Sequence, residues 1–204
     1  MRIVVLLCFS VLLTGCSVFG DNGVESAPYT LLQQDQNKAI EIRRYDYMIL
    51  VSTRMQNDSE NRAFRNLFDY ITGDNKGRQE IAMTAPVMIQ DPSQGEEIAM
   101  TAPVFVSDTD GVMSFVMPNN FTLESTPEPN NPNVWVTEVK DYKVAAITFS
   151  GLRSDTNIEK YTSRLMAYVN DNNLSVKGPA LEAGYNGPLT LPMFRKNEVL
   201  IPIN

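Results

Sequence analysis

The feature that most restricts the fold of this chain is a match between its two halves at a constant offset of 97 residues. One register aligns a long strand-like segment, a helix cap and an apolar helix face. The aligned pairs are Glu41 with Glu138, Ile42 with Val139, Arg43 with Lys140, Tyr45 with Tyr142, Asp58 with Asp155, Ser59 with Thr156, Phe64 with Tyr161, Phe68 with Leu165 and Ile71 with Tyr168. The chain is therefore predicted to be an internal duplication of a strand–helix–strand unit.

Two such units can share one sheet and close it, which removes the exposed edges that promote aggregation. The predicted fold class is α+β, with a distorted antiparallel β-barrel built from two pseudo-symmetric β-α-β halves and two flanking helices. The halves are expected at about 29–118 and 134–204, within a single domain spanning 29–204. Strand patterns cover residues 29–34, 38–55, 81–90, 98–106, 113–117, 134–149, 180–185 and 198–203.

Two helices are expected between the strands. The first spans residues 60–71, because apolar residues recur there with helical spacing. The second spans 156–169, where Thr156 and Glu159 have the spacing of a capping box. The apolar positions of the first helix are Phe64, Leu67, Phe68 and Ile71.

The first 28 residues read as a targeting segment. A short basic start at Arg2 and an eleven-residue apolar run, 3–13, have the size of a signal peptide and are too short to span a bilayer. The run ends in Leu-Thr-Gly-Cys, which resembles the bacterial lipobox. Residues 1–15 are thus predicted to be a signal peptide, Cys16 the lipidation site, and 16–28 a tether. The alternative is an ordinary secretory signal with a chance cysteine.

By analogy with Gram-negative lipoproteins, Ser17 after that cysteine favours a lipid anchor in the outer membrane, facing the periplasm. The expected location is the bacterial cell envelope. The membrane would then be contacted through the N-terminal lipid, since a chain of net charge −7 does not bind anionic lipid by charge. The same acidity argues against a nucleic-acid partner. No protein partner is indicated.

Composition narrows the possible chemistry. The chain has no histidine, and its two cysteines, Cys8 and Cys16, both lie in the N-terminal segment. Catalysis by Ser-His or Cys-His pairs, HExxH zinc sites and histidine-ligated heme are therefore excluded. No catalytic residue and no metal site are predicted, and the protein is expected not to be an enzyme.

Several segments together resemble the SOUL heme-binding protein family in its bacterial branch. IAMTAPV occurs twice, at 81–87 and 98–104, and SFVMPNNFTLESTPEPNNPNV follows at 114–134. EIRRYDYMILVSTRM at 41–55 and RKNEVLIPI at 195–203 extend the resemblance over nearly the whole mature chain. It implies a two-half distorted barrel with two helices, and binding of heme or another tetrapyrrole without established catalysis.

The resemblance places the ligand along the first helix and its adjoining loops. Heme is the implied cofactor, held by apolar contact without histidine ligation. The candidate heme-binding residues are Arg62, Phe64, Arg65, Phe68, Met83 and Met100. Each also has a purely structural interpretation: Phe68 and Ile71 are expected in the core, Phe64 stays open, the methionines fill strand cores, and the arginines form a solvated face.

Three classes of function remain after these exclusions. The preferred one is binding, carriage or buffering of a tetrapyrrole or another apolar small molecule. The alternative is an interaction or structural module of the envelope without a tetrapyrrole ligand. An enzyme that acts on heme is the least favoured, because the chain offers neither imidazole nor a thiol in its mature domain.

Overall fold

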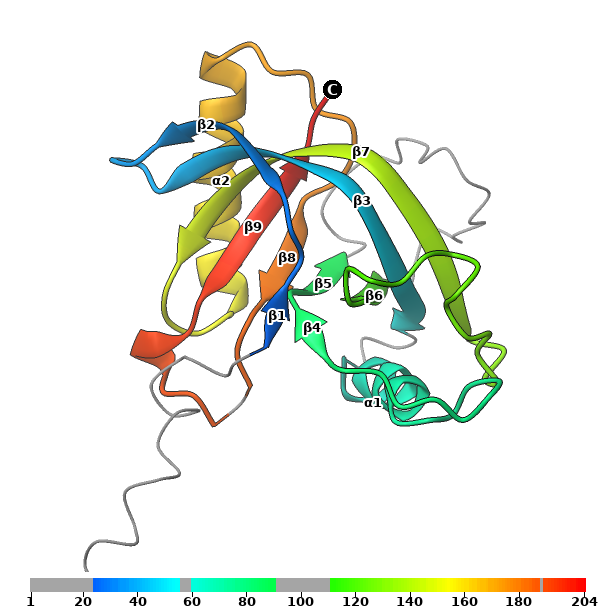
Figure 1. The fold of residues 1–204 in the computed structure, drawn as a ribbon. Helices are drawn as coiled ribbons and strands as arrows, with labels where there is room; N and C mark the ends of the chain where they lie inside the picture. The colour runs from blue at the N-terminus through cyan, green and yellow to red at the C-terminus, as the bar shows by residue number, and fades with distance from the viewer. Residues whose placement is uncertain (1–23, 56–59, 91–110, 188) are drawn as a thin grey trace, which may run out of the picture.

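The computed structural model describes residues 24–55, 60–90, 111–187 and 189–204. Its core is a six-stranded antiparallel barrel in which β3, β6, β5, β8, β9 and β7 follow one another and β7 pairs back with β3 (Figure 1). The elements are β1 (Glu25–Ser26), β2 (Thr30–Asp35), β3 (Ile40–Met55), α1 (Glu60–Ile71), β4 (Thr84–Ala85), β5 (Val87–Gln90), β6 (Gly111–Val116), β7 (Val134–Phe149), α2 (Asp155–Asp171), β8 (Leu181–Gly184), the 3-10 helix η2 (Pro192–Phe194) and β9 (Asn197–Pro202). The predicted fold class is confirmed.

The two longest strands, β3 and β7, form the seam between the halves. They pair antiparallel over most of their length, and Tyr45 lies opposite Tyr142. These two residues are 97 positions apart, so the pairing register of β3 and β7 matches the offset seen in the sequence. Asp141, next to it, has a positive φ of 46°.

The alternation of side chains reverses near the Tyr45–Tyr142 pair. In the first part of β3, Ile40 and Ile42 pack toward α2, whereas further along Ile49 and Val51 pack toward α1. Side chains in a strand alternate between the two faces of the sheet. A one-residue irregularity therefore moves all the following side chains to the opposite face. Each long strand can therefore contribute to both halves.

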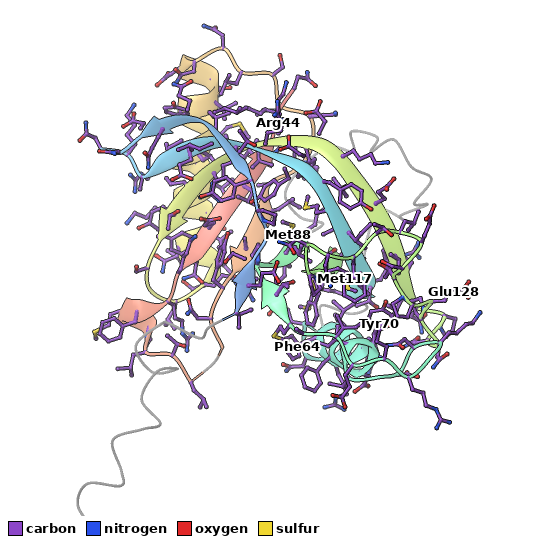
Figure 2. The ribbon with its side chains drawn as sticks, in the orientation of Figure 1. Arg44, Phe64, Tyr70, Met88, Met117 and Glu128 are labelled. Carbon is purple, nitrogen blue, oxygen red and sulfur yellow. The ribbon has the colours of Figure 1, made fainter. Side chains whose placement is uncertain are left out.

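Three apolar clusters fill the molecule. One lies between the sheet and α1, and another between the sheet and α2. The third lies inside the barrel and includes Tyr45, Met48, Met88, Val144 and Leu200. Figure 2 labels Met88 near the centre of the barrel and Tyr70 on α1. The barrel interior is thus packed with side chains.

Local details differ from the sequence expectations. The capping-box prediction is wrong: α2 begins at Asp155, after the N-cap residue Ser154, so Thr156 lies within the first turn. The strand expected at 81–90 is divided into β4 and β5 by Pro86, which has no N–H for a ladder. Within the segment 16–28 that was expected to be a tether, residues 25–26 form β1, which pairs with β4.

The lipidation site Cys16, the strand expected at 98–106 and the candidate Met100 lie outside the described residues. In the part of the chain that the structure describes, no helix has the length and apolarity needed to cross a membrane.

Candidate functional site

An exposed pair of phenylalanines marks the outer surface of α1. Phe64 and Phe68 are 40% and 43% exposed, and their rings stack with centroids 6.0 Å apart at 15°. Phe64 also touches the buried Phe115 of β6, edge to face, at 5.3 Å. This contact holds the inner edge of the pair on the sheet, and both rings remain partly exposed. Figure 2 labels Phe64 on α1.

The helix holds this pair in place through its opposite side. Ala63, Leu67, Tyr70 and Ile71 are buried against the sheet, and the Tyr70 hydroxyl donates to the carbonyl of Pro127 at 2.7 Å. The prediction for Ile71 is confirmed, whereas that for Phe68 as a core residue is wrong. The buried stripe is centred near Leu67, and the next residue along a helix is rotated by about 100°.

The two arginines of α1 lie at different distances from the aromatic pair. With about 100° per residue, Arg65 lies about 60° beyond Phe68, and Arg62 lies about 60° beyond Arg65 and about 120° from Phe68. Both arginines are exposed. Arg65 therefore borders the aromatic pair, and Arg62 lies one position farther around the helix.

The candidate Met83 is partly buried and packs on the cluster beneath α1, which also contains Phe115. Met88, Met113 and Met117 are buried, as expected for core-filling methionines. The sequence-predicted residues brought together on one surface are therefore Phe64, Phe68 and Arg65.

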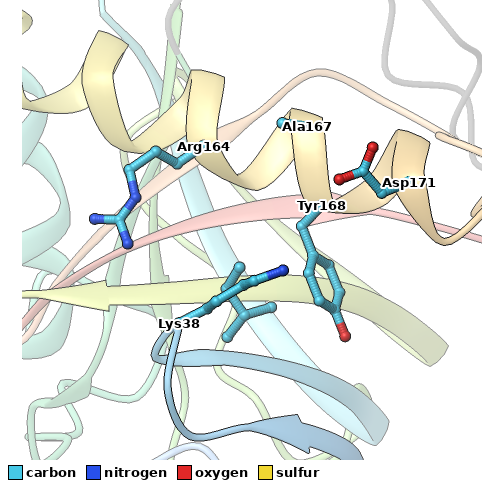
Figure 3. Close-up of a pocket in the computed structure, with 6 residues that line it drawn as sticks. Lys38, Arg164, Ala167, Tyr168 and Asp171 are labelled. Carbon is cyan, nitrogen blue, oxygen red and sulfur yellow. The ribbon is translucent and has the colours of Figure 1, made fainter.

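A groove of about 290 Å³ lies on the other half, between α2 and the β2–β3 turn. Figure 3 shows Lys38 beside the ring of Tyr168, at 5.4 Å from its centroid, with Arg164 and Asp171 on the helix above. Its size is at the lower limit for small-molecule sites. Because this groove is small for a macrocycle, α1 is the better candidate.

A buried ion pair crosses the barrel interior. Arg43 of β3 donates from Nη1 and Nη2 to the Glu198 carboxylate of β9, with both distances 2.8 Å. The Tyr185 hydroxyl donates to the same carboxylate at 2.6 Å. Glu41 accepts from Arg43 Nε at 2.6 Å, and the guanidinium lies 4.4 Å from the centroid of the Tyr29 ring. The sequence patterns did not predict this network. The signal that could have indicated it is the presence of charged residues within otherwise apolar strand segments.

The network shifts the pKa values of its members. Burial raises the pKa of Glu198, but the hydrogen bonds and charge of Arg43 outweigh it and hold that pKa at about 2. Burial acts to lower the pKa of Arg43, and the bonds to Glu198 raise it above its ordinary value. Burial also raises the pKa of Tyr45 to about 12. The Glu198 carboxylate thus stays ionised and paired.

Within residues 24–55, 60–90, 111–187 and 189–204, no group of three or more cysteine, aspartate or glutamate side chains could hold a metal ion. The aromatic surface of α1 is suited to a flat apolar ligand with a cation at its rim. The residues present fit a tetrapyrrole held by contact, with Arg65 placed for a propionate.

Comparison with solved structures shows a shared fold. The C-terminal domain of EcmrR has a TM-score of 0.58 at 14% identity, covering 81% of this chain and 96% of that one. An uncharacterized conserved protein from Listeria innocua has a TM-score of 0.58 at 11% identity, covering 82% and 93%. A hydrolase from Listeria innocua has 0.54 at 8%, covering 82% and 92%. A comparison with curated proteins gave no match.

The molecule is thus a closed α+β barrel with two external helices, one of which presents an aromatic surface. Residues 24–202 match the family model described as SOUL heme-binding protein. The chain belongs to this family, in agreement with the sequence motifs. The family suggests binding of heme or another tetrapyrrole.

Proposed function

We propose that this protein is a lipid-anchored envelope protein that binds heme or a related tetrapyrrole on the outer surface of α1, as a carrier or buffer without catalysis. The observation that carries the proposal is the stacked Phe64–Phe68 pair. Both rings are exposed, and they lie on the helix where the family resemblance leads us to expect the ligand. A tetrapyrrole is flat and apolar, so it can cover both rings at once. The lipid at Cys16 and the outer-membrane location rest on the lipobox-like sequence alone.

The binding mode follows from the residues available. With no histidine in the chain, contact between the macrocycle and the phenylalanine rings supplies the main attraction. Arg65, next to Phe68 on the helix, can pair with a propionate at the edge of the macrocycle. Iron therefore needs no ligand from an imidazole in this mode, and the Soret band should lack the shift typical of histidine ligation.

Reversing the charge of Arg65 should weaken hemin binding by about three- to tenfold, because an exposed cation contributes modestly and in a salt-dependent manner. Arg62→Glu changes the net charge equally but lies farther around the helix, about 120° from Phe68, so it should weaken hemin binding less than Arg65→Glu does. Hemin titration of residues 17–204, followed by absorbance at low and moderate salt, measures both variants. Equal weakening by the two substitutions would mean that overall charge, and not a site at Arg65, determines affinity.

A further inference from the structure

The connection between β8 and β9 has an unusual distribution of side chains. Among residues 189–194, four large apolar side chains are exposed: Leu189, Leu191, Met193 and Phe194. Leu189 is 80% and Met193 68% exposed. The polar Thr190, in contrast, is buried. Apolar side chains are usually buried and polar ones exposed, so this segment shows the reverse arrangement. Clustered exposed apolar side chains are typical of contact surfaces.

This segment, here called the apolar loop, is held in a defined shape. The backbone carbonyl of Thr190 accepts from Arg195 Nε at 2.8 Å, and the Phe194 amide donates to the Leu191 carbonyl at 2.9 Å. The Gly151 amide donates to the Pro192 carbonyl at 2.9 Å, which places the exposed Leu152 nearby. Backbone hydrogen bonds therefore hold the segment in the shape that exposes its leucines.

The apolar loop lies at the end of the barrel where the described chain begins. β1 pairs with β4 through Ser26 and Ala85, and β5 pairs with β8 through Val87 and Gly184, the last residue of β8. These two strand pairings place β1, the first strand of the described chain, near Gly184 at the base of the loop. Figure 1 shows β1 and the orange-to-red connection between β8 and β9 at the same end.

The distance to the expected anchor is short. Cys16 precedes Val24 by eight residues, which can span at most about 28 Å when fully extended. A lipid on Cys16 would therefore keep this end of the barrel close to the bilayer. Lys196 follows the loop, and its half-exposed side chain pairs with Glu198 at 3.2 Å.

We infer that the apolar loop inserts Leu189, Leu191 and Met193 into the bilayer beside the lipid on Cys16. The loop thereby fixes the barrel with its β8–β9 end against the membrane. The occupant of this surface is a phospholipid bilayer, because apolar insertion next to an acyl anchor requires no net positive charge on the protein. This inference rests on the lipid anchor of the proposed function.

The test uses the full acylated chain in vesicles of phosphatidylethanolamine and phosphatidylglycerol. Met193→Cys carries an environment-sensitive nitrobenzoxadiazole label, and Leu189→Cys provides an independent second position. Asn170→Cys, exposed in the last turn of α2 at the opposite end of the barrel, is the matched control. We expect a shift to shorter emission wavelength and quenching by acyl-chain nitroxide lipids at 193 and 189, and neither effect at 170.

Adding Leu191→Ser and Leu189→Ser to the Met193→Cys variant should abolish the quenching while the protein still sediments with vesicles. Unquenched probes on a chain whose mass shows acylated Cys16 would overturn the loop inference and leave the anchor standing. A blue shift without lipid quenching would show that another copy or protein covers the loop, which also overturns it. An unmodified Cys16 would overturn both, whereas hemin binding by α1 is measured separately.

Discussion

Hemin is expected to bind the Phe64→Ala, Phe68→Ala variant at least about tenfold more weakly than the unaltered protein, since each aromatic contact contributes about 0.5–1.5 kcal/mol beyond area burial. The two rings are stacked and almost half exposed. A macrocycle bound on the outer side of α1 would contact both rings. Titration of residues 17–204 by absorbance and by fluorescence quenching measures the change in Kd.

The control for this experiment is Leu31→Ala on β2, a side chain with 47% exposure and no part in α1. It removes a similar exposed apolar group elsewhere and should leave hemin affinity unchanged. Because Phe64 contacts Phe115, urea unfolding of the double variant must show that the fold persists. A folded double variant with full affinity would exclude α1 as the ligand surface.

Glu198→Gln is expected to lower the free energy of unfolding by about 3–5 kcal/mol, the cost of leaving a buried charge without its partner. The Glu198 side chain is fully buried, and its carboxylate accepts from Arg43 and Tyr185. Glutamine retains the shape but not the charge that compensates the guanidinium. Equilibrium urea unfolding, monitored through the single tryptophan, measures the difference.

Two further variants test the cause of that loss. Glu128→Gln breaks an exposed pair with Lys76 and should change stability very little. Arg43→Met combined with Glu198→Leu removes both charges and should recover much of the stability lost in Glu198→Gln. If the double variant is as unstable as the single one, packing and not charge compensation explains the effect.

The same pair predicts an acid dependence. The pKa of Glu198 is lowered from its ordinary value of 4.5 to about 2 in the folded protein. Its contribution is therefore fully present above pH 4.5 and is lost as the pH falls toward about 2. A shift of this size corresponds to about 3 kcal/mol. Stability of Glu198→Gln should fall less steeply over that range than stability of the unaltered protein.

Much of the fold could be predicted from local patterns. The alternation at Ile40 and Ile42 and the continuous apolar run after Tyr47 identify β3, and the spacing of Leu67 and Ile71 identifies α1. The offset of 97 residues pointed to a relation between the long strands, and β3 and β7 pair in one sheet with Tyr45 opposite Tyr142. These features depend on neighbouring residues or on one repeated register, so the sequence contains them directly.

Features that depend on barrel closure were not predictable in the same way. Arg43 and Glu198 are 155 positions apart, and only the closed ring brings them together. Phe68 was misplaced for a different reason, because an apolar helix stripe four residues wide does not show where its centre lies. The structure places that centre at Leu67 and leaves Phe68 beside Arg65 on the surface.

The most direct test of the account is to map a tetrapyrrole on the protein by amide NMR. Protoporphyrin IX without metal, added to ¹⁵N-labelled residues 17–204, should cause ring-current shifts concentrated on the amides of residues 64–72, around Phe64, Arg65 and Phe68. Shifts concentrated instead around Lys38, Arg164 and Tyr168, or saturating additions that leave the α1 amides unmoved, would contradict binding on the outer surface of α1.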